Sequence, residues 1–494
     1  MQSIAENLLR RITLGDCLRR TAKRYPRKIA LTYQDRRATY EQFNELANRF
    51  ANAMTGRGYS KGSKIAFLGL NCSEFLFSLF GCAKAGFVFV PLNPLLRPEE
   101  LFYAADHADV EAIIMEENFT PTVCELLPRL PKIQSVVRID RGGGKLEGML
   151  DYEELLSQGT TEEPEVLIDE RDAVEVLYTG GTTSFPRAAV LTHLGLVMST
   201  TSIAMDFRSY HTDVNLTVMP LFHVAQLVAT LSAILTGGSN VIMPWVDFKG
   251  MLEVIEKERV TLFFLVSTMY RFFMDEPDFD KYDLSSLRIA FYFGAVMPES
   301  LQRECMERIA PDIGLGFGQT EMSPTASTFK PEDQLRKAGS LGNSSIFVEM
   351  EIMDEAGNIL PRMQIGEIVY RSPHLMEGYY NDPASNEAAF QDGWFHSGDL
   401  AYMDEDGFLY IVGRKHDRIV AQGHTVWPTV VETVLESHVA VEAAVAFGVP
   451  DPLRCSTDVR AAVKLAESHE PSIELESELI ALCASRLEEY QVPM

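Results

Sequence analysis

The sequence predicts an α/β protein. It should have a large N-terminal domain of doubly wound βαβ subdomains with a small β-barrel-like subdomain, followed by a small α/β C-terminal domain. Over about the first 338 residues, helical and strand-like runs alternate, which is typical of parallel βαβ units with helices on both faces of a sheet. From Gly339 to Gly413, short runs are separated by Gly, Pro and Asp turns, which indicates antiparallel sheet or a small barrel. The length of 494 residues also predicts more than one domain.

The first α/β subdomain is expected over about residues 1–172. Within it, residues 40–54 have helical periodicity and residues 64–70 form a short apolar strand. The apolar stretch 75–94 is interrupted by Lys84 and by two glycines. We therefore interpret this stretch as a buried helix, a turn and a strand, and not as a membrane span.

The second α/β subdomain is expected over about residues 173–338. Its strand-like runs are VEVLYT, VNLTVMP, SNVIMP, VTLFFLV and LRIAFYFG, with helical segments between them. The β subdomain at 339–413 completes an N-terminal domain over residues 1–413, and mixed α/β patterns return in a C-terminal domain over residues 414–494.

Charge and cysteine usage narrow the classes of partner. The formal net charge of −26 argues against a nucleic acid or an anionic membrane surface, because both bind basic patches. The seven cysteines are widely spread and form no CxxC pair, which fits reduced thiols in a cytoplasmic protein and predicts no zinc site. The N-terminus has no apolar signal core. No sequence feature indicates an oligomeric state.

A loop rich in Gly, Ser and Thr follows the strand-like run that ends at Thr179. Its glycines allow close approach to a ligand, and its backbone N–H groups and hydroxyls can form an anion cradle. Arg187 could add a charge-assisted contact to phosphate. Neither a GxxxxGK[ST] loop nor a GxGxxG fingerprint is present here. These residues alone fit a phosphate-binding loop and an ordinary turn equally well.

The spacing of this stretch resembles the phosphate-loop signature of the acyl-adenylate-forming superfamily, which includes the acyl-CoA synthetases. The matching residues are Tyr178, Thr179, Gly181, Thr182, Thr183, Pro186, Leu191, Thr192 and His193. Gly180, Ser184 and Arg187 stand where the family usually has Ser, Gly and Lys. The resemblance implies that the ATP phosphates are held by Thr179, Gly181, Thr182, Thr183 and Arg187.

Further matches to the family follow in order along the chain. PLFHVAQL implies that His223 lies beside an acyl pocket, although the residue alone also fits a core histidine. LSSLRIAFYFGAVMP implies that Gly294 and Ala295 lie against adenine.

GFGQTEMSP resembles the family's YGxTE motif. The match implies that Phe317 lies on the adenine side, that Gly318 contacts the nucleotide, that Thr320 contacts phosphate and that Glu321 binds Mg²⁺. A hard cation that bridges phosphates needs such a carboxylate oxygen. Taken alone, Glu321 also fits an exposed acid in a turn.

DGWFHSGDLAYMDEDGFLYIVGRKHDRI resembles the most specific motif of the family. The match implies that Asp399 binds the ribose hydroxyls and that Arg414 contacts ribose or phosphate. His416 stands at the position of the family's interdomain hinge, and Gly423 at the tunnel for coenzyme A. The family continues beyond the YxVP segment to a Gly-Lys motif, whereas this sequence stops at Met494, so we expect the C-terminal domain to be incomplete at its end.

The segments that would line an acyl pocket are apolar, which suggests an apolar chain or ring as substrate. The candidate lining residues are His223, Phe264, Tyr270, Tyr292 and Met322. Core packing is the alternative role for each of them. Arg271 is the only cation in these segments, so a dicarboxylate is less favoured.

The resemblance implies an acyl-CoA synthetase, an enzyme type that serves fatty acid metabolism. ATP and Mg²⁺ would activate a small-molecule carboxylic acid to acyl-AMP, and the thiol of coenzyme A would accept the acyl group. The residues implied in catalysis are Thr179, Arg187, His223, Thr320 and Glu321. A carrier-protein thiol is an alternative acceptor. The departures at Gly180, Ser184 and Arg187 leave open a nucleotide- or acyl-AMP-binding homologue with weakened catalysis.

Overall fold

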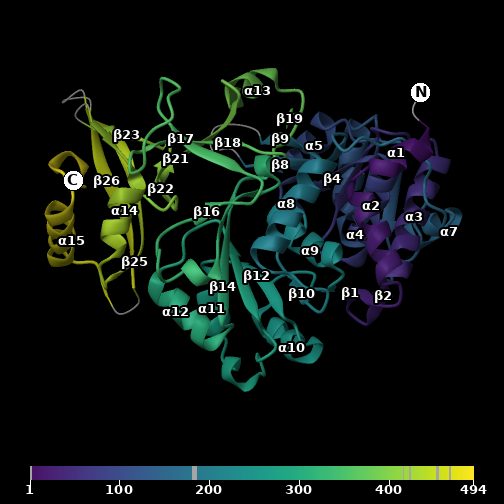
Figure 1. The fold of residues 1–494 in the computed structure, drawn as a ribbon, viewed down its shortest axis with the longest axis horizontal. Coiled ribbons are helices and arrows are strands. Elements are labelled where there is room, and N and C mark those ends of the chain that lie inside the picture. The colour runs from purple at the N-terminus through teal and green to yellow at the C-terminus, as the bar shows by residue number, and fades with distance from the viewer. Residues whose placement is uncertain are drawn as a thin grey trace. The chain divides into compact units, whose positions relative to one another are not determined.

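The structure is a computed structural model, and Figure 1 shows the course of the chain. It describes residues 3–180, 186–415, 417–421, 424–451, 456–466 and 469–493. The chain forms two compact units, of which the larger contains Met1–Glu349 and Arg371–Ala389 and the smaller contains Met350–Tyr370 and Phe390–Met494. The domain boundary after residue 413 stays a prediction.

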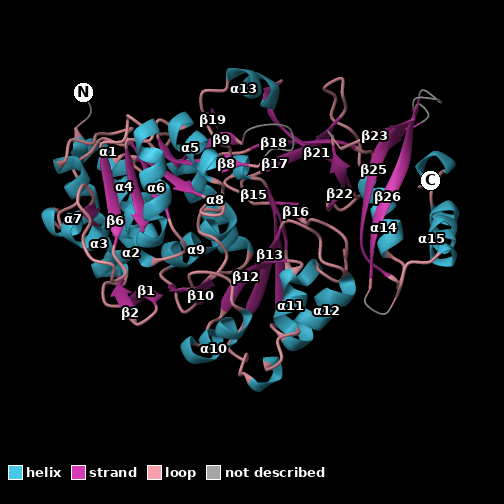
Figure 2. Ribbon diagram, turned by 180° about the vertical axis from the view of Figure 1, so that it is seen from behind, coloured by secondary structure: helices cyan, strands magenta, loops and turns pink. Residues whose placement is uncertain are grey.

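The described residues of the larger unit form two large sheets, each with a run of parallel strands and with antiparallel strands at one or both edges (Figure 2). In spatial order, the strands of the nine-stranded sheet are β16 (Asn343–Ser344), β15 (Thr325–Phe329), β14 (Asp312–Gly318), β13 (Ile289–Phe293), β12 (Leu262–Val266), β10 (Val214–Thr217), β11 (Ser239–Ile242), β1 (Ile29–Tyr33) and β2 (Arg36–Thr39). The pairs from β14 to β1 are parallel, whereas β15, β16 and β2 are antiparallel to their neighbours.

The eight-stranded sheet follows the same plan. In spatial order its strands are β19 (Gly378–Tyr379), β9 (Arg187–Thr192), β8 (Ala173–Thr179), β4 (Val88–Leu92), β3 (Lys64–Leu68), β5 (Ala112–Glu116), β6 (Ser135–Ile139) and β7 (Leu150–Asp151). The strands from β8 to β7 are parallel, and β9 and β19 are antiparallel to their neighbours. The predicted α/β fold class is thus confirmed, with its parallel sheets in the large N-terminal part.

The helices of the larger unit follow the strand–helix alternation that the sequence predicts. They are α1 (Ile4–Arg10), α2 (Leu14–Arg24), α3 (Tyr40–Gly56), α4 (Ser73–Ala85), α5 (Pro98–His107), α6 (Thr120–Leu126), α7 (Tyr152–Gln158), α8 (His193–Asp206), α9 (Val224–Thr236), α10 (Phe248–Glu258), α11 (Met269–Met274), α12 (Glu299–Arg308) and α13 (Pro383–Ala389).

The apolar stretch that raised the question of a membrane span is α4 followed by β4, as predicted. Every residue of α4 is buried, which explains why it lacks an amphipathic pattern. The helix ends at Gly86, whose φ of 71° is a left-handed conformation that glycine adopts without strain. Among the described residues, no helix combines the length and the apolar character needed to cross a membrane.

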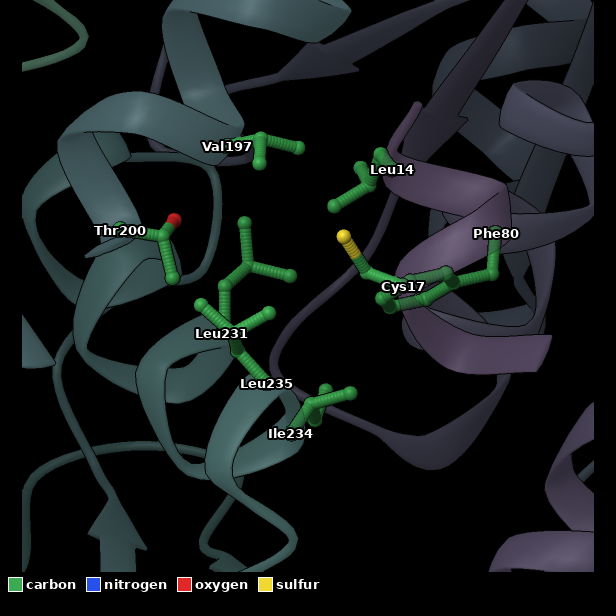
Figure 3. A pocket seen from close by; sticks show the side chains of 8 residues that line it. All are labelled: Leu14, Cys17, Phe80, Val197, Thr200, Leu231, Ile234 and Leu235. Carbon is green, nitrogen blue, oxygen red and sulfur yellow. The ribbon is translucent and has the colours of Figure 1, made fainter. Parts of the chain in front are cut away.

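A small apolar pocket lies where the helices beside the two sheets pack together. Helix α2 contacts α4, α8 and α9, and side chains from all four helices line the pocket (Figure 3). Cys17 and Leu231 are buried there, and the buried Thr200 hydroxyl has no hydrogen-bond partner in the described structure. None of the lining residues is a predicted site residue.

The described residues of the smaller unit form sheets of few strands and two α-helices. Its elements are β17 (Glu349–Met353), β18 (Gly366–Arg371), β20 (Phe390–Gln391), β21 (Trp394–Met403), β22 (Leu409–Arg414), β23 (Ile419–Ala421), β24 (His424–Val426), α14 (Pro428–Glu436), β25 (Val441–Asp451), β26 (Ser456–Leu465) and α15 (Ile473–Arg486). Strand β21 pairs antiparallel with β18, β20 and β22. This pairing confirms the antiparallel sheet that the sequence predicts. Side chains from α14, α15 and the strands after β22 form a separate apolar core.

Candidate active site

The first predicted phosphate contacts lie at the connection between β8 and β9. In this antiparallel pair, Thr179 at the end of β8 faces Arg187 at the start of β9. The Thr179 hydroxyl donates a hydrogen bond to the Arg187 carbonyl over 3.3 Å, and Arg187 is exposed. The predicted contacts Gly181, Thr182 and Thr183 lie outside the described residues. Thr179 and Arg187 therefore lie side by side where the two strands meet the loop.

Glu321 lies in the turn Thr320–Met322, just beyond the end of β14. The residue is only 6% exposed, and the Tyr379 hydroxyl donates a hydrogen bond to its Oε1 over 2.7 Å. The Cζ atom of Arg187 lies 4.4 Å from the centroid of the Tyr379 ring. Contacts therefore join Arg187, Tyr379 and Glu321, which belong to three segments far apart in the sequence.

Tyr379 is a candidate site residue that sequence reasoning missed. It lies inside the segment 339–413, for which the sequence predicts the β subdomain, yet its strand β19 pairs with β9 of the larger unit, where Tyr379 faces Ala189. The backbone N–H of Met376 also donates to the Glu321 carbonyl over 2.8 Å. A strand of two residues carries no hydrophobic period, so only a three-dimensional structure reveals this pairing.

The chain between β14 and Glu321 is tightly packed at Gly318. A Cβ atom at this position would lie 2.0 Å from the Pro324 carbonyl oxygen, and the φ of 154° is one that L side chains rarely adopt. Phe317 before it is buried, and Thr320 after it is partly exposed. Glycine is thus needed here for β14 to pass close to the chain that returns as β15.

The predicted adenine-side residues lie at the edge of the nine-stranded sheet where β14 ends and the turn of Glu321 begins. Strands β13 and β14 are parallel neighbours, with Phe293 beside Gly316. Gly294 and Ala295 follow β13 directly and are exposed. Because both strands end at one edge, these residues and the turn of Glu321 occupy the edge at which α/β proteins bind ligands.

His223 precedes α9, and its side chain is open to solvent. Its ring packs against Phe222 with 4.7 Å between the ring centroids. Surrounding protein atoms nevertheless exclude part of the water around the imidazole, and this desolvation lowers the pKa of His223. The role of His223 beside an acyl pocket stays a prediction.

The other predicted acyl-pocket residues are buried. Phe264, in the middle of β12, makes an edge-to-face contact with Phe293 at the end of β13, with 5.1 Å between the ring centroids. Met322 is fully buried in the turn of Glu321.

The hydroxyls of the two predicted pocket tyrosines bond to protein groups. Tyr270 donates to the Phe291 carbonyl, and Tyr292 donates to Oε1 of Gln334 over 2.9 Å. Both residues are fully buried. Tyrosines that only pack in the core make the same kind of hydrogen bond. The acyl-pocket role of Tyr270 and Tyr292 therefore stays a prediction.

The smaller unit contains the predicted ribose contact. Asp399 on β21 faces Arg414 on β22, and the Arg414 Nε lies 3.3 Å from Asp399 Oδ1. The Asp399 backbone N–H donates to the Ser397 hydroxyl over 3.0 Å. The structure thus brings together these two predicted nucleotide contacts. The predicted hinge His416 and tunnel residue Gly423 lie outside the described residues.

A second carboxylate lies near this pair in the sheet. Glu367 on β18 accepts hydrogen bonds from Lys415 Nζ and the Gly398 backbone N–H, each over 3.0 Å, and its Oε2 lies 3.0 Å from His396 Nδ1. Burial by itself raises the pKa of Glu367, but these hydrogen bonds and the Lys415 charge lower it overall. This ionised carboxylate fixes the backbone just before Asp399.

A magnesium site at Glu321 would have to be completed by the nucleotide. Among the described residues, no group of three His, Cys, Asp or Glu side chains is placed to hold a metal. Mg²⁺ binds readily through one or two carboxylates together with water and substrate phosphates. The buried Glu321 carboxylate therefore fits a Mg·ATP complex. Arg187 on β9 and the Thr179 hydroxyl on β8 would complete the phosphate contacts.

Comparison with known proteins identifies the class of protein to which this fold and candidate site belong. The sequence profile of AMP-binding enzymes matches residues 18–380, and that of the AMP-binding enzyme C-terminal domain matches residues 430–494. The chain belongs to the AMP-binding enzyme family.

Its relatives include CoA ligases that align over almost their whole length. The chain is 31% identical over 513 residues to the putative acyl-CoA synthetase YngI of Bacillus subtilis, covering 97% of this chain and 92% of that protein. It is 32% identical over 482 residues to a feruloyl-CoA synthase of Amycolatopsis, covering 97% and 94%.

A solved structure of the same class matches the fold. The structure of the anthranilate CoA ligase AuaEII in complex with anthranoyl-AMP superposes with a TM-score of 0.88 at 25% identity, covering 97% of this chain and 92% of that one.

Proposed function

We propose that this chain activates an apolar carboxylic acid with Mg·ATP and transfers the acyl group to the thiol of coenzyme A. The class of reaction, ATP-dependent acyl-CoA formation by an AMP-forming acid–thiol ligase, follows from its family membership. The series of contacts from Arg187 through Tyr379 to Glu321 supports the proposal most directly, because it gathers a phosphate-binding cation and a metal-binding carboxylate.

The reaction has two steps whose atoms balance. A carboxylate oxygen of the acid attacks the α-phosphorus of ATP, and pyrophosphate leaves. The sulfur of coenzyme A then attacks the acyl carbon, AMP leaves and the thiol proton is released. Neither step requires covalent attachment to the protein, so its residues contribute by positioning the reactants and stabilising charge.

Four of the candidate residues have defined roles in this scheme. Thr179 and Arg187 would bind the phosphates that become pyrophosphate, and Glu321 would be the carboxylate that holds Mg²⁺. Asp399 accepts hydrogen bonds from the ribose hydroxyls. Bound Mg²⁺ would supply charge neutralisation at the phosphates.

The nature of the acid follows from the candidate pocket and from the relatives. Phe264 in β12 and Phe293 at the end of β13 contribute aromatic rings in edge-to-face contact. Arg271, the one cation of the predicted lining segments, forms an ion pair with Glu304 at 2.9 Å. A second carboxylate on the substrate would have to compete with Glu304. Relatives named for feruloyl, indoleacetate and long-chain fatty acid substrates favour an aromatic or aliphatic monocarboxylate here.

We also propose that the protein works in the cytoplasm. The six cysteines among the described residues are free thiols, and reduced cysteines are typical of that compartment.

Acid-dependent exchange between labelled pyrophosphate and ATP tests the first step without coenzyme A. We expect exchange with at least one aromatic or aliphatic monocarboxylate and none without acid. Glu321→Gln should abolish it, because an amide replaces the metal-binding carboxylate. Exchange that is unchanged in Glu321→Gln would contradict the assigned role of Glu321.

A further inference from the structure

We propose that Tyr379 is a positioning residue that sets the geometry of two groups at once, the Glu321 carboxylate through its hydroxyl and the Arg187 guanidinium through its ring. The inference rests on the roles proposed above for Glu321 and Arg187. It adds a residue that touches neither the acid nor the nucleotide and acts through its two neighbours.

The backbone of Tyr379 is fixed on both sides. Through β19 it pairs with β9, where Tyr379 faces Ala189. On its other side, the Asn386 side chain accepts from the Tyr379 N–H over 2.6 Å and donates to the Tyr379 carbonyl over 2.9 Å. A Cβ atom at Gly378 would lie 2.9 Å from Asn386 Oδ1, so this close approach requires a small residue there. Because its backbone is fixed in this way, Tyr379 can hold the side chains that it contacts in defined positions.

The hydroxyl of Tyr379 selects one orientation of the Glu321 carboxylate. It donates to Oε1 over 2.7 Å, a length typical of hydrogen bonds to an ionised oxygen. Because one oxygen is held, the direction of the other is set by the carboxylate plane. The turn of Glu321 is held as well, since Met376 of the same segment donates to the Glu321 carbonyl over 2.8 Å.

The ring of Tyr379 supports Arg187. Arg187 is exposed and starts β9, so its long side chain would otherwise adopt many conformations. With Cζ 4.4 Å from the ring centroid, the guanidinium is within the range of cation–π attraction. Arginine suits this position, because a planar guanidinium stacks on a ring while its edge still presents N–H groups to phosphate.

The two functions can be separated by substitution. Tyr379→Phe removes the hydroxyl and keeps the ring, whereas Tyr379→Leu removes both. Tyr380→Phe is the matched control, because the adjacent Tyr380 donates its hydroxyl to Asp109 over 2.6 Å and not to Glu321. Binding of ATP is measured by calorimetry over a series of Mg²⁺ concentrations, and kcat and KM for Mg·ATP are measured where an acid substrate is known.

For Tyr379→Phe we expect the Mg²⁺ concentration that gives half-maximal ATP binding to rise about five- to tenfold, because a hydrogen bond to a charged group is lost. ATP affinity at saturating Mg²⁺ should stay within about twofold of wild type. Tyr379→Leu should weaken ATP binding about fivefold or more even at saturating Mg²⁺, because the support of Arg187 is lost too. Tyr380→Phe should match wild type.

A purely structural role would lower the melting temperature of Tyr379→Phe without moving its Mg²⁺ dependence. An unchanged Mg²⁺ dependence, equal to that of Tyr380→Phe, would overturn the inference. Binding is measured without turnover, so the outcome is independent of the proposed reaction. If no acid supports AMP release by the wild-type protein, the proposed function fails, while the difference between Tyr379→Phe and Tyr380→Phe still decides the role of Tyr379.

Discussion

Asp399 and Arg414 face each other across β21 and β22, with Arg414 Nε 3.3 Å from Asp399 Oδ1. The carboxylate is largely buried, whereas the guanidinium is mostly exposed. A carboxyl group held in this way can accept hydrogen bonds from two hydroxyl groups of one sugar.

Removal of the Asp399 carboxylate should therefore weaken nucleotide binding through the ribose. We expect Asp399→Ala to bind AMP about 10- to 100-fold more weakly, which corresponds to loss of hydrogen bonds to a charged group. The wild-type protein should bind 2′,3′-dideoxy-AMP more weakly than AMP by a similar factor. In Asp399→Ala the two nucleotides should bind alike. A wild-type protein that does not distinguish AMP from its dideoxy form would contradict this role.

Glu175 should make stability depend on pH near neutrality. Its side chain is fully buried in β8, both carboxylate oxygens lack a hydrogen-bond partner in the described structure, and this desolvation raises the pKa of Glu175 to about 8. The folded state favours the protonated acid, so stability is complete below about pH 4.5 and is lost as the pH rises through about 8. Glu175→Gln should remove a cost on the order of 4 kcal/mol at pH 8.5 that is absent at pH 5.

Urea unfolding of the two proteins at several pH values measures this difference. A gap in unfolding free energy that is the same at pH 5 and pH 8.5 would show that Glu175 does not titrate in this range.

His193 should act in the opposite direction. It is fully buried at the start of α8, its Nδ1 accepts a hydrogen bond from the Leu14 N–H over 3.3 Å, and burial lowers the pKa of His193 to about 4. Stability is complete above pH 6.5 and falls as the pH drops through about 4, by about 3 kcal/mol from this residue. His193→Asn keeps an acceptor and should lose this acid sensitivity. Parallel acid unfolding curves for the two proteins would refute the assignment.

Gly318 should tolerate no side chain, whereas Gly294 should accept alanine at lower cost. A Cβ atom at position 318 meets the Pro324 carbonyl oxygen, while one at Gly294 meets open space although φ is 99°. We expect Gly318→Ala to lower the unfolding free energy by about 3 kcal/mol or more, and Gly294→Ala by about 1 kcal/mol. Thermal melting compares them. Equal losses in both variants would mean that close packing at Gly318 does not limit this turn.

The sequence predicts the parallel α/β units well, because their signals are local. Residues 40–54 and the stretch 75–94 carry strong periodicity or continuous apolar character, and they are α3 and α4 with β4. The antiparallel strands after residue 339 follow from their Gly, Pro and Asp turns. The ordered motifs identify the family, which implies roles for Glu321 and Asp399.

Contacts between distant segments could not be predicted. Strand β19 leaves its neighbours in the sequence to pair with β9, and no local pattern distinguishes Tyr379 from Tyr380. The sequence also cannot separate pocket from core in apolar runs. Tyr270 and Tyr292 have hydroxyls bonded to interior protein groups, which only the three-dimensional packing reveals.

The central claim is that acid, ATP and coenzyme A are converted together into acyl-CoA, AMP and pyrophosphate. The most direct measurement incubates the protein with Mg·ATP, coenzyme A and a panel of aromatic and aliphatic monocarboxylates, and quantifies AMP and thioester in the same samples. We predict one AMP for each acyl-CoA with at least one acid, and no AMP without acid. Tight ATP binding with neither AMP nor thioester from any acid would contradict the account, and AMP release that requires a carrier protein in place of coenzyme A would contradict its acceptor.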